Sequence, residues 1–574
     1  MIVFALMVIA LVIVGVACVR ALWTRLDPEG AARTTPLEWI AAGALFGVAG
    51  WLAMQWVFAL THTLRAIPLW TSVVLLLGAA IVIVIRHARR FPLPPNVLFL
   101  IPLALWIAFI LWRGLILPPL SHDALAYHLP KAVLLERAGG YELFHAPDAR
   151  IDRFPFNYEL LLADVLILSG TDTYTEWIGT VSYVFFLLAT AALAQRWWRS
   201  SANGIIAAIL CTGGAPILLL HSGAHKNDLL VAWFSLCALM WGSRWIVEGG
   251  QIPLLLTIMA VAFGIGTKTT VAAIAVALVP FMIWQLIRRR DVVFAGFAFL
   301  ACFTLGGGVT LAANYLTLGD SSGVTSMTTT ATKLTAIAYG DWNNFWQVPY
   351  LLLTVPFSRV LQGVWVPWDS RYWYWPHYEI YFSHYGEWIT ILAVLVPFAI
   401  WRYRRTGQTR ERWIASCAAL LAVIVMLPTQ IRPLGFFGTF ARYFCFIVPI
   451  VVCLVVPPVI DEVATRSRRL VHVAMAVFLI IFTMQAVTCG VLDRFAPIEY
   501  VRWVAEHPGT RIIYFQPSRA GSVVDRLAGP HDTVAVDGAF DTWVYPAYGR
   551  NRTRPVVFLA PGTTPDRIPP EAKW

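Results

Sequence analysis

Two short polar segments of the chain combine carboxylates with imidazole and cationic side chains. Residues 121–131 include Asp123, Tyr127, His128 and Lys131, and residues 221–228 include His221, His225, Lys226, Asn227 and Asp228. A carboxylate can take a proton from an attacking hydroxyl, and a nearby cation can stabilise a developing anion. If residues 121–131 form one regular helix, Asp123, Tyr127 and Lys131 share a face. Asp123 and Asp228 could equally be helix-capping residues, so each acid alone fits a structural role too.

Three further basic residues stand where they could hold an anion. Arg150 and Arg153 precede an aromatic-proline step, and Lys268 follows a glycine-rich break between two apolar runs. Guanidinium groups bind phosphate through paired hydrogen bonds. An ammonium at mid-membrane costs about 3 kcal/mol, so Lys268 should face protein, water or an anion. The alternatives are interfacial anchoring for the arginines and, for Lys268, contact with carbonyls freed at the break.

Metal binding has weaker support in the sequence. His221 and His225 are four residues apart and Asp123 and Asp228 could join them, but no zinc-type arrangement is complete. The eight cysteines lie in or beside apolar runs, without a CxxC pair. We therefore predict no definite cofactor and leave a divalent metal open.

Composition identifies the class of protein that must position these residues. The chain has 574 residues, of which 59% are hydrophobic and 13% charged. The charged share is about half that of a soluble domain, which excludes a soluble enzyme, a disordered chain and a nucleic-acid-binding domain. The net charge of +11 comes mainly from short Arg and Lys clusters between apolar runs, a pattern typical of membrane topology signals.

Apolar runs of about 20 residues predict an all-α polytopic membrane protein with about 14 transmembrane helices. The predicted spans are residues 2–23, 38–60, 69–85, 96–117, 174–195, 203–220, 229–247, 253–266, 269–287, 292–316, 387–401, 413–427, 443–460 and 470–490. The run at 253–266 is short and should break at its glycines. The apolar part of 156–169 has only about 13 residues, so we expect an interfacial helix that does not cross.

Arginine clusters then fall in alternate loops. They include Arg86, Arg89 and Arg90; Arg196 and Arg199; Arg288, Arg289 and Arg290; Arg402, Arg404, Arg405, Arg410 and Arg412; and Arg466, Arg468 and Arg469. The positive-inside rule places these loops in the cytoplasm of an inner (plasma) membrane protein. Both termini and the segments 118–173, 317–386 and 491–574 then lie outside, together with every candidate site residue.

The chain divides by composition into five parts. We predict extra N-terminal helices at 1–95, a catalytic membrane module at 96–316, an aromatic-rich external loop at 317–386, C-terminal helices at 387–490 and a small external α/β domain at 491–574. In that last domain we expect a helix at 498–506 and strands at 511–515, 533–536 and 555–559.

In order along the chain, these motifs resemble those of the GT-C superfamily of integral-membrane glycosyltransferases. The similar branch is bacterial and groups glycosyltransferase family 39, protein mannosyltransferases and lipid A aminoarabinose transferases. The matching features are Asp123 and Tyr127 after a helix end, Phe154-Pro155 opening a helix that ends in Ser169-Gly170, Lys226-Asn227-Asp228, Thr267-Lys268, and the tail Tyr545-Pro546-Ala547-Tyr548-Gly549-Arg550. Many members carry Asp-Glu at the first site, whereas Ala124 follows Asp123 here.

The resemblance implies transfer of one sugar from polyprenyl phosphate, on the external (periplasmic) face and with inversion. Asp123 would be the general base with Asp228 as a second catalytic acid, and Arg153, Lys268 and Arg150 would hold the donor phosphate. Contacts to the acceptor or sugar would fall to Tyr127, His128, His225, Lys226 and Asn227. The acceptor would be a glycan, lipid or protein, and the sugar a hexose or pentose. The alternative function is a multi-pass lipid or polysaccharide transporter or flippase, and a scaffold is a third class.

Overall fold

The computed structural model describes most of the membrane region and part of the C-terminal tail. The described residues are 2–87, 97–116, 119, 121, 123–144, 146, 148–319, 387–426, 441–491, 524, 527–537, 542–549, 551–559, 563–564 and 567–572. The aromatic-rich loop predicted at 317–386 therefore lies almost wholly outside the described residues. So do the predicted helix at 498–506 and the predicted strand at 511–515.

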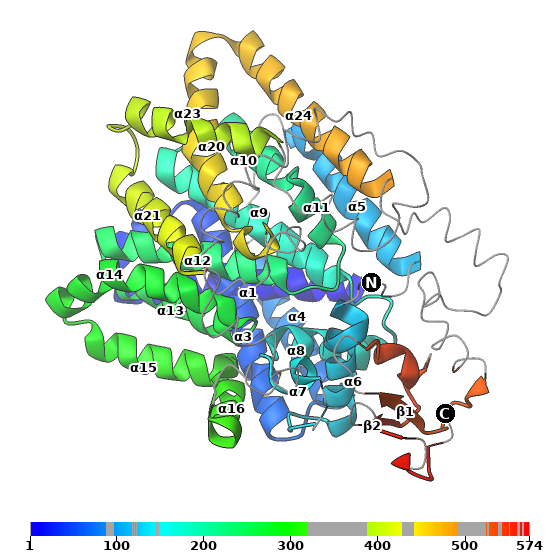
Figure 1. Cartoon of the computed structure of the whole chain (residues 1–574). Helices are drawn as coiled ribbons and strands as arrows, with labels where there is room; N and C mark the ends of the chain where they lie inside the picture. The colour runs from blue at the N-terminus through cyan, green and yellow to red at the C-terminus, as the bar shows by residue number, and fades with distance from the viewer. Residues whose placement is uncertain are drawn as a thin grey trace.

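The described chain is a bundle of α-helices with a small sheet at one end (Figure 1). The helices are α1 (Ile2–Leu26), α2 (Pro28–Ala32), α3 (Pro36–Leu60), α4 (Ala66–His87), α5 (Ile101–Ile116), α6 (Leu129–Ala138), α7 (Ala149–Asp152), α8 (Asn157–Ser169), α9 (Trp177–Trp198), α10 (Ala202–Gly213), α11 (Pro216–Ser222), α12 (Asp228–Glu248), α13 (Gln251–Ile265), α14 (Ala272–Arg289), α15 (Val292–Phe303), α16 (Val309–Leu318), α20 (Glu387–Arg402), α21 (Thr409–Met426), α23 (Ile447–Arg466) and α24 (Arg468–Val491). Every predicted span coincides with a helix or with consecutive helical segments.

Ten of the described helices are long and apolar enough to cross a membrane, which confirms a multi-pass membrane protein. The number rises to eleven if α10 and α11 count as one span, but these two helices are bent by 76° and do not form the straight helix that we predicted at 203–220. Pro216 opens α11 and cannot continue the hydrogen-bond ladder of α10. As expected, α13 is short and ends at Ile265.

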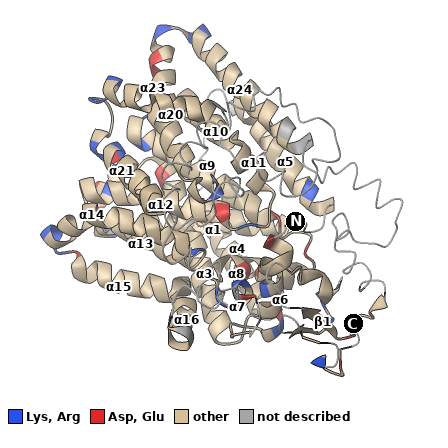
Figure 2. Ribbon diagram, viewed as in Figure 1, with Lys and Arg blue, Asp and Glu red and all other residues tan. Residues whose placement is uncertain are grey.

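One end of the bundle, here called the arginine-rich face, joins helix ends through buried ion pairs. Arg196 at the end of α9 pairs with Glu411 at the start of α21 (2.5 Å) and with Glu248 at the end of α12. Arg244 of α12 pairs with Glu38 at the start of α3 (2.9 Å) and with Glu248 (3.1 Å). We call Glu38, Arg196, Arg244, Glu248 and Glu411 the brace cluster. Figure 2 shows Lys and Arg gathered at the helix ends on this side, near α14, α21 and α23.

The other end of α12 carries Asp228, so about 30 Å of helix separates the two ends of this 21-residue element. The loops that the sequence assigned to opposite sides thus meet at opposite ends of the bundle. Helix α8 runs for 13 residues, ends before the left-handed Gly170, and coincides with the helix predicted at 156–169. It packs on α3, where Trp51 donates to Asp164 (2.8 Å) and Trp56 donates to Asn157 (2.6 Å). The N-terminal helices therefore support the predicted catalytic module directly.

The tail contributes strands β1 (Val534–Asp537) and β2 (Val556–Leu559), close to the predicted positions. They pair in parallel with Val534 opposite Val556. The tail docks on α6, because Arg552 pairs with Glu136 (3.0 Å) and Arg137 donates to the Arg554 carbonyl (2.7 Å). In Figure 1 the sheet accordingly lies beside α6, at the end of the bundle away from α14 and α15.

Candidate functional site

Asp228 is the first residue of α12 and lies almost completely buried among basic side chains. Lys268 Nζ donates to its Oδ1 at 2.7 Å, and His221 Nδ1 lies 3.6 Å from its Oδ2. Because Asp228 stands at a helix N-terminus, the helix dipole also favours its negative charge. The side chain is 3% exposed. A carboxylate so deep in the protein must be paired to remain charged.

Asp123 reaches the same place from a different loop. Arg442 Nη1 donates to Asp123 Oδ2 at 2.9 Å, and Lys226 Nζ lies 3.5 Å from the same oxygen. Arg442 Nε is 3.7 Å from Asp228 Oδ2, so one guanidinium bridges the two acids. We call Asp123, Lys226, Asp228, Lys268 and Arg442 the site cluster. The structure thus brings Asp123, Asp228 and Lys268 together around Arg442.

The capping explanation for Asp123 does not hold, since its side chain makes no capping hydrogen bond. Its charge is instead set by the site cluster. Burial alone would raise the pKa of Asp123, but the charges of Lys226 and Arg442 outweigh burial and hold that pKa well below its usual value. In this arrangement Asp123 is a firmly ionised carboxylate that anchors cations.

Lys268 owes its position to a close approach of two backbones. A Cβ on Gly266 would lie 1.6 Å from the Gly306 carbonyl oxygen, so only glycine fits there. Asn157 bridges this contact by donating to the carbonyls of Gly306 and Phe263, both at 2.9 Å. The carbonyls near the helix break are thus served by Asn157 and by local turns. Lys268 is left to pair with Asp228 and to face the Tyr443 ring, with Nζ 4.3 Å from its centroid.

Two residues of the loop before α12 hold that loop in place. Asn227 donates to the Thr267 carbonyl (3.2 Å), which joins the loop to the segment carrying Lys268. His225 Nε2 lies 2.8 Å from Thr175 Oγ1. Burial lowers the pKa of His225 to about 3, helped by the charges of Arg113 and His128, so the ring is neutral at neutral pH. Asn227 and His225 therefore fix the loop that carries Lys226 and Asp228.

The two arginines predicted to hold phosphate have other contacts. Arg150 forms a paired interaction with Asp148 (2.7 and 3.0 Å) and lies over the Tyr127 ring, 4.7 Å from its centroid. Arg153 lies 3.2 Å from Asp152 and donates to Thr317 (3.0 Å). Among the described residues, no ion pair joins Arg153 to Asp123 or Asp228. The structure brings Arg442 to the place that we expected Arg153 to take.

The segment after Asp123 is not the regular helix that would align Asp123, Tyr127 and Lys131. Residues Ala124–His128 form a π turn, which shifts the following side chains around the axis. Burial and the charge of Asp123 raise the pKa of Tyr127 well above its usual value, so its hydroxyl stays protonated. Lys131 points away from the site cluster and donates to the carbonyls of Phe154 (2.7 Å) and Pro155 (2.9 Å).

The donor set fits a metal poorly. The described part of the chain holds no group of three or more His, Cys, Asp or Glu side chains that could bind a metal ion. Both carboxylates of the site cluster already face ammonium or guanidinium groups, so a divalent cation would have to displace them.

Sequence reasoning missed Arg442 and the adjacent Tyr443. Both precede α23 on the side of the bundle where arginine clusters are otherwise absent from the sequence pattern. A lone arginine that breaks the charge pattern, directly before an apolar run, was the available signal. The charges of Arg442 and Lys268 outweigh burial and lower the pKa of Tyr443.

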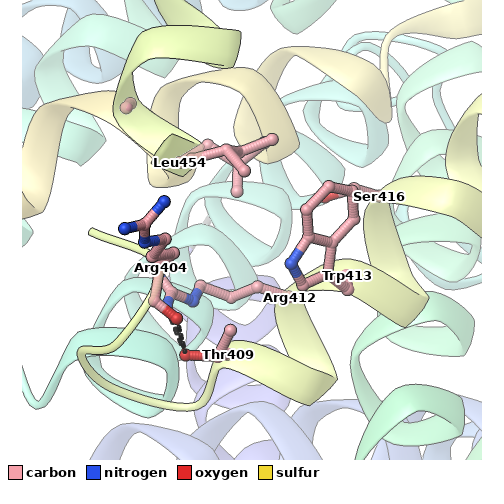
Figure 3. Close-up of a pocket in the computed structure, with 8 residues that line it drawn as sticks. Arg404, Thr409, Arg412, Trp413, Ser416 and Leu454 are labelled. Carbon is pink, nitrogen blue, oxygen red and sulfur yellow. Dashed lines mark hydrogen bonds between the residues drawn. The ribbon is translucent and has the colours of Figure 1, made fainter. Parts of the chain in front are cut away.

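A small cavity lies away from Asp123 and Asp228. It is lined by the ends of α20 and α21 and by α23, and Figure 3 labels Arg404, Thr409, Arg412, Trp413, Ser416 and Leu454 around it. The start of α21 also carries Glu411 of the brace cluster, so this cavity belongs to the arginine-rich face. It contains no lining carboxylate and cannot supply the acid that the proposed chemistry needs.

The fold of this chain is similar to that of solved structures. ArnT from Cupriavidus metallidurans bound to undecaprenyl phosphate is similar with a TM-score of 0.52 and 11% identity, over 80% of this chain and 85% of that one. Arabinosyltransferase EmbB from Mycobacterium smegmatis has a TM-score of 0.41 and 15% identity, over 76% and 46%. The Archaeoglobus fulgidus oligosaccharyltransferase has a TM-score of 0.44 and 12% identity, over 80% and 64%.

The likeness to ArnT confirms the predicted GT-C type of fold. No family model and no curated protein sequence matches the chain. At 11% identity the likeness concerns the architecture alone.

Proposed function

We propose that this chain is a membrane glycosyltransferase that moves one sugar from polyprenyl phosphate to an acceptor hydroxyl. The observation that carries the proposal is the site cluster, in which three cations surround two carboxylates at one end of the bundle. An excess of positive charge beside a buried acid suits a reaction with an anionic leaving group and a hydroxyl nucleophile. The ArnT structure that shares this fold was obtained with undecaprenyl phosphate bound, which supports a lipid-phosphate donor.

We assign the site cluster to the external, periplasmic face of the inner membrane. The arginine-rich face then lies in the cytoplasm, in agreement with the positive-inside rule. Nucleotide sugars are absent outside, so the activated sugar has to arrive on a lipid. We expect helix α8, which follows Arg150 and Arg153 in the sequence, to lie at the membrane interface, near the depth of a lipid phosphate.

The donor phosphate would compete with the carboxylates for the same cations. We expect Arg442 and Lys268 to turn toward the phosphate, because Arg can bind it in a paired fashion and Lys supplies a point charge. Asp123 then loses part of the charge that keeps its pKa low and becomes a better base. Donor binding in this way prepares the site for the acceptor.

In the transfer step the acceptor oxygen attacks the anomeric carbon from the face opposite the phosphate. The bond between the anomeric carbon and the phosphate oxygen breaks, and its electron pair leaves with polyprenyl phosphate. Asp123 takes the hydroxyl proton, while Arg442 and Lys268 stabilise the new phosphate charge. Asp228 holds Lys268 and Arg442 in place. Attack from the opposite face gives inversion.

The direct test uses purified protein with a panel of radiolabelled polyprenyl-phosphate hexoses and pentoses. A cell-envelope extract supplies glycan, lipid and protein acceptors. We expect one donor to release polyprenyl phosphate and to label one acceptor class, and the Asp123→Asn variant to do neither. Absence of release from every donor by the wild-type protein would contradict the proposed function.

A further inference from the structure

The C-terminal tail packs beside the site cluster. Its residues Tyr545–Tyr548 form a short 3-10 helix, and this helix packs against the π turn Ala124–His128 that follows Asp123. Tyr545 Oη donates to Asp172 Oδ2 at 2.8 Å, in the segment that joins α8 to α9. The tail thus forms a buried hydrogen bond with a segment of the membrane region that lies 373 residues earlier in the chain.

A chain of hydrogen bonds leads from Tyr545 to the loop before α12. Thr175 Oγ1 donates to the Asp172 carbonyl at 2.6 Å and lies 2.8 Å from His225 Nε2. The single hydroxyl proton of Thr175 is used on the carbonyl, so His225 Nε2 carries a proton and donates to Thr175. Every donor in this chain therefore points toward Asp172, which accepts from Tyr545 on its carboxylate and from Thr175 on its carbonyl.

The hydrogen-bond chain is buried and ends beside the proposed base. Its four residues are each at most 5% exposed. A buried polar network whose members are paired holds them rigidly. Lys226 follows His225 directly, and Lys226 Nζ lies 3.5 Å from Asp123 Oδ2. A shift of the His225 backbone would therefore move a cation that contacts Asp123.

We propose that Tyr545 is a positioning residue for the Asp123–Lys226 pair and acts through the hydrogen-bond chain that ends at His225; this inference rests on the proposed function. Asp123 can take the acceptor proton only when its carboxylate is directed at the acceptor oxygen, and the contact with Lys226 helps to fix that direction. Misplacing a reacting group by about 1 Å can cost roughly 100-fold in rate, so an anchor outside the membrane helices can affect turnover.

This role separates Tyr545 from the residues that would bind the donor phosphate. We assigned the phosphate to Arg442 and Lys268, which lie on other segments of the chain. Breaking the hydrogen-bond chain should therefore slow the transfer step and leave donor binding nearly unchanged. A merely structural role of Tyr545 would instead reduce the amount of folded protein, without a selective loss of kcat in the molecules that fold.

The test measures kcat per folded molecule and the donor KM for Tyr545→Phe, Thr175→Val and the double variant, with release of polyprenyl phosphate as readout. Each single variant removes one hydroxyl of the hydrogen-bond chain and nearly keeps the shape of the side chain. We expect each to lower kcat by about 10-fold, at a donor KM within about twofold of wild type. Because residues of one hydrogen-bond network are not additive, kcat of the double variant should equal that of Thr175→Val.

Tyr548→Phe is the matched control. Tyr548 lies three residues after Tyr545 and is fully buried, and its hydroxyl has no hydrogen-bond partner among the described residues. The Arg137 guanidinium lies over its ring, 4.7 Å from the centroid, and phenylalanine keeps that contact. Tyr548→Phe should therefore keep the kcat of the wild-type protein.

Three results would each overturn the positioning role: wild-type kcat in Tyr545→Phe, an equal loss of kcat in Tyr548→Phe, or a double variant in which the two losses multiply. If Tyr545→Phe does not fold, Asp172→Ala removes the acceptor of the same hydrogen bond and must show the same non-additivity with Thr175→Val. These results in an active wild-type protein contradict only the positioning role. Inactivity of the wild-type protein with every donor contradicts the proposed function, and the positioning role with it.

Discussion

The two ends of α12 carry two groups of buried charges that are built for different purposes. In the brace cluster two arginines face three glutamates, and Arg196, Arg244, Glu38 and Glu411 are at most 5% exposed. In the site cluster three cations face two carboxylates, and Lys268 is 21% and Arg442 13% exposed. The first group has an excess of negative charge and ties four helices together. The second has an excess of positive charge and partial access.

The difference shows which buried charges to treat as functional. Arg244 uses Nη1 for Glu38, Nε for Glu248 and Nη2 for Thr34 and a carbonyl, so its donors are occupied within the protein. A group satisfied in this way holds a structure together. Lys268 has three donor hydrogens, and its nitrogen makes one short hydrogen bond, to Asp228. Capacity left for an incoming anion distinguishes the site cluster from the brace cluster.

The largest expected effect is on turnover at the site cluster. Asp123→Asn should lower kcat by about 100- to 10,000-fold, because an amide cannot take the acceptor proton. The melting temperature in detergent should change little, since an amide keeps the shape and still accepts from Arg442. Asp228→Asn should lower kcat less, because Asp228 acts through Lys268 and Arg442. Turnover of Asp123→Asn within tenfold of wild type would remove Asp123 as the base.

A change in the brace cluster should lower stability and leave turnover nearly unchanged. Arg196→Met removes one of the two cations that face Glu38, Glu248 and Glu411, and breaking a buried ion pair typically costs 3–5 kcal/mol. We expect a marked fall in the melting temperature, whereas kcat per folded molecule stays near wild type. Thermal unfolding and turnover measured on the same preparation check this. A stable Arg196→Met protein with low kcat would mean that the two clusters are not functionally distinct.

The sequence predicted the helical architecture well because long apolar runs specify the helices. Each predicted apolar span coincides with a helix or with consecutive helical segments, because runs of about 20 apolar residues are read directly from the sequence. The bend between α10 and α11 was missed because Pro216 lies inside a continuous apolar run, where hydropathy alone cannot show a change of direction.

The residues of the site cluster could be predicted only in part, because some of their contacts join distant parts of the sequence. Asp123, Asp228 and Lys268 could be found because each is a charge next to an apolar run. Arg442 could not be assigned, since its partner Asp123 is 319 residues away in sequence and the contact depends on helix packing. The π turn at Ala124–His128 also has no signature that period counting would detect, and it breaks the regular helix that would have aligned Asp123, Tyr127 and Lys131.

A smaller effect, on donor binding, should distinguish Arg442 from Arg153. Arg442→Ala should weaken donor binding by about 1.5–3 kcal/mol, the range for hydrogen bonds to charged groups. Arg442→Lys should recover only part of it, because an ammonium cannot form the paired contact. Arg153→Ala is the matched control and should cost about 1 kcal/mol or less, since Arg153 pairs with Asp152 and Thr317. Binding of a radiolabelled donor to the detergent-solubilised variants measures both. Equal losses of donor affinity in Arg442→Ala and Arg153→Ala would mean that the loop carrying Arg153 reaches the donor.

The smallest effect concerns the response of the site region to acid. The pKa of His225 is lowered to about 3 by burial, whereas an unfolded histidine titrates near 6.5. Between these values the unfolded chain binds one proton more than the folded one. The free energy of unfolding therefore decreases as pH falls through this window, by up to about 1.4 kcal/mol per pH unit.

His225→Asn removes the titrating ring and can keep the contact with Thr175, so its melting temperature should fall less steeply than that of wild type between pH 6.5 and pH 4. His472→Gln, which replaces an exposed histidine on α24, should follow the wild-type curve. If His225→Asn and wild type lose stability in parallel, the acid sensitivity lies elsewhere and the His225–Thr175 contact is only a packing interaction.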